Sequence, residues 1–328
     1  MTPPDPLTEN LLTLHAHLSL RKAGSQSGPG DLPGVLGAVA LASKAIARKI
    51  RRARIDDVIG AAGAANVHGE TQQKLDVLAD RILLECLRAR PDVAAYASEE
   101  QGDPVVVRTL SEGGVFTVLA DPLDGSSNID VAVNVGTIFS VLRNEEDDED
   151  TARSALQAGT RQVAAGYVLY GTSTLMVLTT GQGVDLYALD AELGDFVLVE
   201  EGLRIGEERT YSINEAYWND FSDATRAFLT FAHENGYGSR YIGSMVADVH
   251  RTLLRGGVFL YPPTRKAPDG KLRLMYEGNP MAMLVEQAGG VAAAGTRRLL
   301  EIEPRKLHER TSVLLGSPAA MEHVTRFL

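Results

Sequence analysis

The chain has 328 residues, of which 44% are hydrophobic and 23% are charged, and its net charge is −11 at pH 7. This composition is typical of a globular protein with about two domains of roughly 150 residues each. The acidic balance argues against a nucleic-acid or membrane binder, and no apolar run approaches the roughly 20 residues that cross a bilayer.

Two amphipathic helices are predicted near the start, over residues 34–54 and 72–90. Between them, residues 59–66 are rich in alanine and glycine, which predicts a loop. Asp76 interrupts the apolar side of the second helix near its first turn. Taken alone, such an aspartate is explained by the helix dipole. The start of the sequence has no basic region followed by an apolar core, the pattern of a secretory signal, and this favours a cytoplasmic protein.

Acidic residues follow three predicted strands. These strands are the apolar runs 93–97, 115–120 and 272–276, and carboxylates follow at or just after the end of each run. Ligands of open α/β sheets lie at the carboxyl ends of strands. If the three strands are neighbours, one site therefore collects five acids: Glu99, Glu100, Asp121, Asp124 and Glu277.

The stretch from Asp121 to Asp130, DPLDGSSNID, has the strongest chemical signal. A proline ends strand pairing after Asp121 and the Asp124-Gly125 pair forms a turn, so two carboxylates converge. Together with the Leu123 carbonyl they form a partial shell for a hard cation such as magnesium. The backbone N–H groups of the two serines that follow are placed to receive a phosphate. An Asx turn explains a bare Asp-Gly pair, but not the whole string.

The rest of the chain predicts a second half with a different pattern. Residues 163–199 alternate in polarity between turn pairs, which predicts antiparallel strands. The acidic run 145–150 is typical of a solvated loop. A boundary near residue 200 divides the chain into an N-terminal part, 1–199, and a C-terminal part, 200–328. The single cysteine, Cys86, excludes an intramolecular disulfide.

The string at 121–130 resembles the signature of the magnesium-dependent, lithium-sensitive sugar-phosphate and inositol-phosphate phosphatases. In this form it is similar to the class I fructose-1,6-bisphosphatases. The likeness covers residues 34–318 and includes further motifs in order: GETQQKLD at 69–76, SEE at 98–100, SINEAY at 212–217, RYIGSMVAD at 240–248, FLYP at 259–262, GKLRL at 270–274 and YEGNPMA at 276–282. The resemblance implies an α/β fold with α/β/α/β/α layers in two subdomains, assembled as a homotetramer.

The resemblance also implies two to three magnesium ions per subunit, with manganese or zinc as substitutes. Asp121, Asp124 and Glu277 would hold one ion, and Glu99, Asp121 and the Leu123 carbonyl a second. Glu70 with Glu99 would hold a third in some states. Many family members have aspartate at the position of Glu70, so this site departs from the common pattern.

The implied reaction is hydrolysis of the 1-phosphate of fructose 1,6-bisphosphate to fructose 6-phosphate and phosphate. The metal ions would neutralise the phosphate oxygens and lower the pKa of a bound water. Glu100, aided by Asp76, would take a proton from that water beside Glu99. The implied substrate contacts are Asp124, Gly125, Ser126, Ser127, Asn214, Tyr217, Tyr241, Met245, Tyr261 and Lys271, with Arg240 reaching in from a neighbouring subunit.

Three alternatives remain open at this level. A sedoheptulose-1,7-bisphosphatase or a dual bisphosphatase would share the metal motifs, and a silent sugar-phosphate sensor would be expected to lose one of the acids. Either gluconeogenesis or the Calvin cycle could use the enzyme.

In animal members AMP is bound by threonines near a helix start and by a lysine-tyrosine pair. Residues 28–34 and Val115-Phe116 replace these here, so weak or absent AMP inhibition is expected, although Arg143 is retained.

Overall fold

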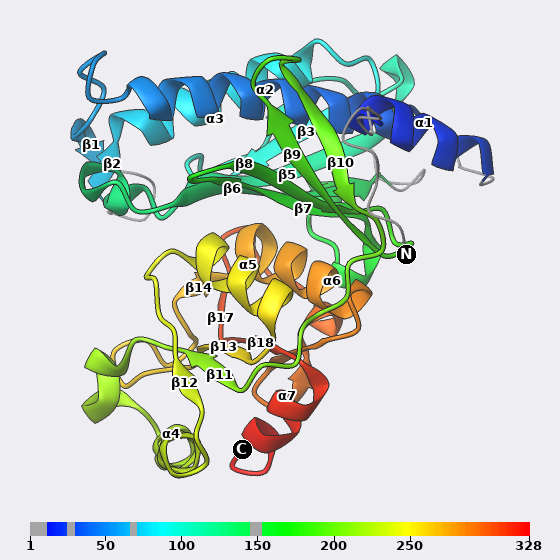
Figure 1. The fold of residues 1–328 in the computed structure, drawn as a ribbon. Coiled ribbons are helices and arrows are strands. Elements are labelled where there is room, and N and C mark those ends of the chain that lie inside the picture. Colours follow the sequence, from blue (N-terminus) through cyan, green and yellow to red (C-terminus); the bar gives the residue numbers. More distant parts are fainter. Residues whose placement is uncertain (1–11, 25–29, 66–70, 145–152) are drawn as a thin grey trace.

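The computed structural model describes residues 12–24, 30–65, 71–144 and 153–328. Helices and sheets alternate in five layers (Figure 1). Three helices cover one face of a large sheet, two helices lie between this sheet and a smaller one, and two more cover the outer face of the smaller sheet. The α/β/α/β/α layering expected from the sequence is confirmed.

The large sheet has eight strands in the order β10-β9-β8-β7-β6-β5-β3-β4. Its strands are β3 (Val93–Ser98), β4 (Val105–Val106), β5 (Phe116–Asp124), β6 (Val135–Arg143), β7 (Gln162–Tyr170), β8 (Thr174–Thr179), β9 (Val184–Asp190) and β10 (Asp195–Glu200). The predicted antiparallel strands after residue 163 are β7 to β10. β3 and β5 are parallel neighbours, which places Ser98 beside Ala120. The acids that follow these two strands therefore meet at one edge.

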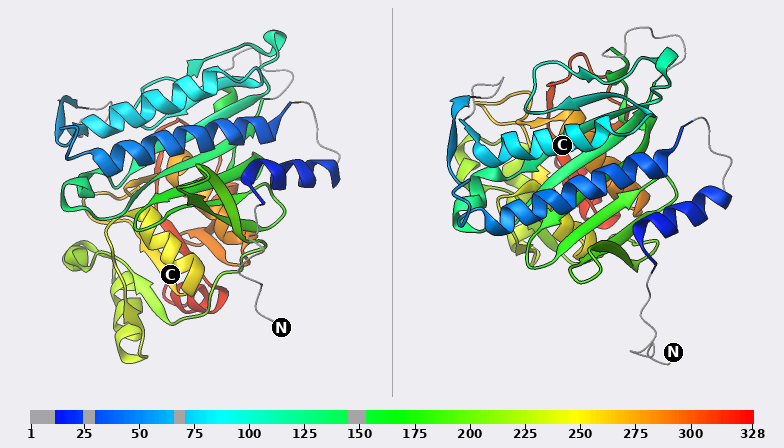
Figure 2. Two further views of the ribbon diagram at one scale, coloured as in Figure 1. Left: turned by 45° about the horizontal axis from the view of Figure 1, so that its top comes forward. Right: turned by 90° about the horizontal axis from the view of Figure 1, so that it is seen from above.

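Helices α1 (Leu14–Gly24), α2 (Leu32–Arg52) and α3 (Lys74–Arg88) cover the outer face of this sheet. α2 and α3 lie side by side across it (Figure 2). Their apolar sides enclose a core with the strands, including the fully buried Leu83, Tyr96 and Phe116. Both predicted helices are confirmed, each beginning and ending within two residues of the expected positions.

The inner layer consists of α5 (Met245–Arg255) and α6 (Asn279–Gln287). The smaller sheet has the order β12-β11-β13-β18-β15-β16. Its strands are β11 (Thr210–Ser212), β12 (Gly238–Ser239), β13 (Val258–Tyr261), β15 (Val291–Ala294), β16 (Arg297–Arg298) and β18 (Val313–Gly316), and α4 (Asp223–Glu234) and α7 (Pro318–Thr325) cover its outer face. None of the helices in the described part of the chain is long and apolar enough to cross a bilayer.

Two sequence expectations about local structure are wrong. Part of the stretch predicted as a loop, Ala61–Ala65, is strand β1, which pairs with β2 (Thr71–Gln73). The predicted strand 272–276 contributes only β14 (Leu272–Arg273), which pairs with β17 (Arg310–Thr311), and the chain then enters a π-helical turn, Leu274–Gly278. β1 forms by pairing with β2, which follows it closely in the chain, whereas β14 pairs with a segment far along the chain, and neither pairing can be predicted from the residues of the strand itself.

The proline at 122 does not end β5 either. Asp121 pairs with Ile138 and Asp124 pairs with Gly136, so three steps along β5 match two steps along β6. The extra residue forms a β-bulge, in which proline is tolerated because one residue is left outside the ladder. Asp121 and Asp124 therefore converge across a bulge within a strand and not across a turn after it.

Candidate active site

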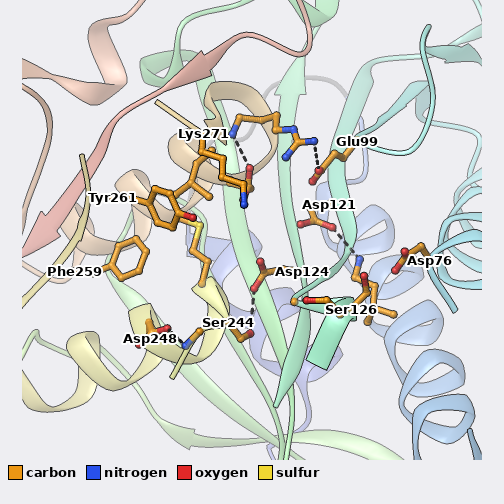
Figure 3. Close-up of a pocket in the computed structure, with 18 of the residues that line it drawn as sticks. Asp76, Glu99, Asp121, Asp124, Ser126, Ser244, Asp248, Phe259, Tyr261 and Lys271 are labelled. Atoms are coloured by element: carbon orange, nitrogen blue, oxygen red, sulfur yellow. Dashed lines mark hydrogen bonds and ion pairs between the residues drawn. The ribbon is translucent and has the colours of Figure 1, made fainter. Parts of the chain in front are cut away.

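A polar cavity of about 300 Å³ opens where β3 and β5 end, beside the first turn of α5. Among the residues that the structure describes, seven carboxylates line it, but only two cationic side chains do, Lys271 and Arg273. Glu99, Asp121 and Asp124 lie on one side of the cavity and Tyr261 lies across from them (Figure 3). Such an excess of negative charge in a confined space requires a cation, protons or both.

Three buried carboxylates form the centre of the cavity wall. Asp121, Asp124 and Glu277 are 5%, 9% and 4% exposed, and each offers an oxygen within 4.8 Å of the others. Glu277 comes from the π-helical turn of another part of the chain and not from a third strand of the same sheet. The structure brings together the three acids that the sequence analysis named, but the expectation that Glu277 follows a neighbouring strand of the same sheet was wrong.

Backbone and hydroxyl donors orient these carboxylates. Asp121 Oδ1 accepts from Leu123 N at 3.0 Å, and Glu277 Oε2 accepts from Arg273 N at 2.6 Å. Asp124 Oδ2 accepts from Val246 N at 2.7 Å and from Ser244 Oγ at 3.3 Å. Each acid is thus held in place by a neighbouring N–H group while it lines the cavity.

Burial is the largest cause of the pKa shifts in the cluster. It raises the pKa of Asp121 and Glu277 well above the ordinary carboxyl range, and the nearby Glu99 charge raises both further. Burial also raises the pKa of Asp124 to about 7, although the hydrogen bond from Val246 N opposes the shift. Carboxylate oxygens grouped in this way match the ligands that hard divalent cations prefer. The residues present therefore fit a metal ion.

Glu99 has a cationic partner that sequence reasoning missed. Arg273 Nη2 lies 3.0 Å from Glu99 Oε1, and the two side chains are only 6% and 11% exposed. The available signal was a charged residue within the otherwise apolar run that precedes Glu277. Glu99 and Glu100 both line the cavity, in the turn that follows β3.

Asp76 enters the cavity from α3, where its Oδ2 accepts from Gln73 N at 2.8 Å in a capping box. Burial raises the pKa of Asp76 to about 6, more than the hydrogen bonds from the Gln73 backbone and the Ser126 side chain lower it. Its proton therefore exchanges near neutral pH, which suits a group that assists proton transfer.

The segment after the bulge offers phosphate donors. Gly125 has φ 76° and precedes the 3₁₀ helix Ser126–Val131, whose first residues line the cavity. A Cβ at position 125 would lie 2.7 Å from Ser244 Oγ, so only glycine fits between the two halves of the chain. The N–H groups of Ser126 and Ser127 follow this glycine at the start of a helical turn.

The residues expected to bind the sugar phosphate lie in two adjoining spaces, except for Arg240. Tyr241, Met245, Tyr261 and Lys271 line the cavity. Asn214 and Tyr217 line an adjoining space of about 190 Å³, which shares Tyr261 and Lys271 with the first. Arg240 lines neither space, and its Nη1 donates to Ser239 O at 2.7 Å. Glu70 lies outside the described residues.

Sequence reasoning also missed Asp248 and Ser244 at the first turn of α5. Asp248 is 1% exposed and accepts from Ser212 Oγ at 2.6 Å, Ile242 N at 2.9 Å and Gly243 N at 2.9 Å. It therefore holds the loop that carries Tyr241. A carboxylate among the buried positions of an amphipathic helix was the signal for it.

Two family models match this chain. Residues 13–201 match the N-terminal domain of fructose-1-6-bisphosphatase and residues 205–328 match its C-terminal domain. Together they cover most of the sequence. The chain belongs to the fructose-1,6-bisphosphatase family.

Relatives within the fructose-1,6-bisphosphatase family agree over nearly the whole length. The chain is 44% identical to fructose-1,6-bisphosphatase isozyme 2 of Rattus norvegicus over 324 residues, which are 97% of this chain and 95% of the rat protein. The holo form of the Leishmania major enzyme superposes with a TM-score of 0.91 at 37% identity, covering 96% of this chain and 98% of that one. Its apo form gives a TM-score of 0.86 at 35% identity, with the same coverage.

Proposed function

We propose that this chain hydrolyses the 1-phosphate of fructose 1,6-bisphosphate, giving fructose 6-phosphate and phosphate. The observation that carries the proposal is the group of three buried carboxylates, Asp121, Asp124 and Glu277, with oxygens within 4.8 Å of one another. They lie in one cavity with the Ser126 and Ser127 backbone. Family membership supports the same substrate.

The proposed cofactor is magnesium, two to three ions per subunit, with manganese or zinc as substitutes. Asp121, Asp124 and Glu277 would hold one ion, and Glu99 with Asp121 and the Leu123 carbonyl another. When bound, divalent ions neutralise the phosphate oxygens and activate a water molecule. Glu70, which the resemblance places at a third ion, is part of the same proposal.

The chain's own groups would orient the reactants and move the proton. Glu100 would accept the proton of the attacking water, and Asp76 would assist because its pKa of about 6 lets it exchange a proton near neutral pH. The N–H groups of Ser126 and Ser127 would hold the scissile phosphate. At the other end, Lys271, Tyr241, Tyr261 and their neighbours would bind the second phosphate.

The division of labour between the halves is also a proposal. Residues 1–199 would provide most of the metal site and residues 200–328 the sugar-phosphate contacts, with Glu277 crossing from the second half to the first. We further propose a cytoplasmic homotetramer that serves gluconeogenesis or the Calvin cycle.

Phosphate release from fructose 1,6-bisphosphate, measured with magnesium and with a chelator, tests the proposal. We expect metal-dependent release, reduced about 100-fold or more by Glu100→Gln, which removes the base, and by orders of magnitude by Asp121→Asn. Asp103→Asn, an exposed acid just after the same turn, is the matched control and should retain wild-type turnover. A Glu100→Gln or Asp121→Asn enzyme that keeps most of its activity would refute the assignment.

The alternative substrate is a seven-carbon sugar bisphosphate. The metal cluster would serve either sugar, and only the contacts around Tyr261 and Lys271, in the cavity and in the adjoining space, would differ. Steady-state rates on sedoheptulose 1,7-bisphosphate beside those on fructose 1,6-bisphosphate distinguish a single from a dual bisphosphatase.

A further inference from the structure

The turn of residues 98–101 carries Glu99 and Glu100 into the cavity, and backbone N–H groups tie it to β5 and to Ser98. Glu99 N donates to Ala120 O at 3.0 Å, which ties the turn to β5. Within the turn, Gln101 N donates to Ser98 O at 3.2 Å and Glu100 N to Ser98 Oγ at 3.2 Å. The residue after Glu100 therefore decides how the turn leaves the strand.

Gln101 is held from behind the cavity by Asp80. Asp80 lies one helical turn after Asp76 on α3, which runs beside β3 (Figure 1). It is 9% exposed, and its Oδ2 accepts from Gln101 Nε2 at 2.6 Å. Its Oδ1 accepts at 2.9 Å from the hydroxyl of Tyr96, a fully buried residue of β3. One carboxylate thus fixes both the strand that enters the turn and the residue that leaves it.

The carbonyl of Gln101 is fixed from a third direction. His308 Nε2 lies 2.9 Å from Gln101 O, and because a carbonyl only accepts, the histidine nitrogen is the donor. The His308 ring packs against Tyr276, with centroids 5.2 Å apart, and Tyr276 precedes Glu277. Gln101 is therefore held from two sides, by Asp80 of α3 and by His308, which packs against the residue before Glu277.

We propose that Asp80 and Gln101 form a positioning pair, which sets the angle of the 98–101 turn so that Glu99 reaches the metal cluster and Glu100 reaches the reacting phosphate. Neither residue lines the cavity, so neither is a catalytic residue. The inference rests on the proposed function, because it gives these two glutamates their tasks. A purely structural pair would change stability without changing the turnover of the folded enzyme.

The test exchanges the carboxylate and the amide between positions 80 and 101. Gln101→Glu places two carboxylates at hydrogen-bond distance, where they can stay in place only by sharing a proton. Turnover is therefore compared at about pH 9, where the shared proton is lost and the two charges repel each other. We expect turnover to fall about 100-fold, because a displacement of about 1 Å at a reacting group has that effect. Asp80→Asn should cost about fivefold at most, since the glutamine amide can turn over and a hydrogen bond to a charged group becomes a neutral one. Asp80→Asn combined with Gln101→Glu restores an amide facing a carboxylate, so it should regain most of the lost turnover.

Two further readouts separate positioning from folding. The thermal shift that saturating magnesium causes should shrink in Gln101→Glu and return in the double variant, because Glu99 moves with the turn, while the Michaelis constant for the sugar bisphosphate should stay near wild type. Gln101→Met, which lacks both charge and hydrogen bond, keeps the test valid if Gln101→Glu does not fold; it should lose turnover and should not be rescued by Asp80→Asn. Glu85→Gln, an exposed acid further along α3, is the control and should match wild type.

The inference is overturned if the double variant is no better than Gln101→Glu, or if Gln101→Glu keeps wild-type turnover and magnesium shift. Failure of the proposed function looks different: the wild-type chain would then release no phosphate with any divalent metal. In that case the thermal shift with magnesium, compared among the wild type, Gln101→Glu, Asp80→Asn and the double variant, still measures whether the pair positions Glu99.

Discussion

At the scale of single residues, the cavity is dominated by carboxylates that burial makes reluctant to ionise. Asp124 is the clearest case, because its pKa rises to about 7 although Val246 N and Ser244 Oγ donate to it. An unfolded aspartate titrates near 4. Between these two pH values the metal-free folded chain keeps a proton that the unfolded chain has lost.

This difference predicts the pH dependence of the metal-free protein. Because the folded state binds more protons, the free energy of unfolding should fall as pH rises from about 4 to about 7, by about 1.4 kcal/mol per pH unit for one proton. Urea unfolding at several pH values in a chelator measures this slope. Asp124→Asn should make the slope shallower by its share of one proton, while Asp121, Glu277 and Asp76, whose pKa values burial also raises, keep the remainder. An unchanged slope in this variant would contradict the assignment.

Metal binding should show the opposite dependence. Magnesium competes with the same protons, so its affinity should increase as pH rises from 6 to 8, with proton release. Calorimetry in buffers of different ionisation enthalpy counts the released protons. Equal magnesium affinity at both pH values would show that the buried acids are not the ligands.

At the scale of elements, the start of α5 joins the two halves of the site. Its first turn donates to Asp124, and Asp248 in the same turn holds the loop that carries Tyr241. Asp248→Asn puts an amide N–H group against backbone N–H donors. Leaving one buried donor unpaired costs about 1–3 kcal/mol, so we expect the loop to move and the Michaelis constant to rise about tenfold or more.

Steady-state kinetics of Asp248→Asn should show a larger change in the Michaelis constant than in turnover. Ser212→Ala is the matched control, because it removes one donor to Asp248 but leaves the carboxylate facing the loop. A fall in turnover with an unchanged Michaelis constant would indicate that Asp248 acts on the metal site instead.

The packing around Phe116, the first residue of β5, supports the expectation of weak AMP inhibition. Phe116 is fully buried, Arg143 lies 4.8 Å above its ring, and a Cβ on Gly30 would lie 2.6 Å from it. This packing places a phenyl ring where animal members have a hydroxyl donor, and the nearby Asp31 is an anion, paired with Arg90. Inhibition assays should show little effect of AMP. Micromolar inhibition that Arg143→Ala abolishes would prove this wrong.

At the scale of the whole molecule, Arg240 tests the proposed tetramer. It lines neither space of its own chain, which is consistent with the proposal that it reaches the sugar phosphate of a neighbouring subunit. Arg240→Ala should raise the Michaelis constant far more than it lowers turnover, because it removes a cation for the second phosphate. Arg209→Ala, an exposed arginine on the neighbouring segment, is the control. The shared site would be contradicted if the Michaelis constant rose and turnover fell by the same factor, or if the wild-type enzyme sedimented as a monomer.

Local pattern was enough to predict much of this protein. Apolar periodicity predicted α2 and α3, because each buries one side against a core. Continuous apolar runs predicted β3 and the start of β5, whose residues are buried on both faces of the sheet. The string from Asp121 to Asp130 indicated the family and two of the site acids, Asp121 and Asp124. These features reside in short stretches of sequence, where side-chain type and spacing act directly.

Only the tertiary structure decided which distant groups meet. It placed Glu277 in a π-helical turn, put Pro122 in a bulge, paired Arg273 with Glu99, and set Asp80 behind Gln101. Each of these contacts joins segments that are far apart in the chain or depends on how two strands align. Their energy comes from burial and hydrogen bonding between elements, and the sequence of either segment alone does not contain that information.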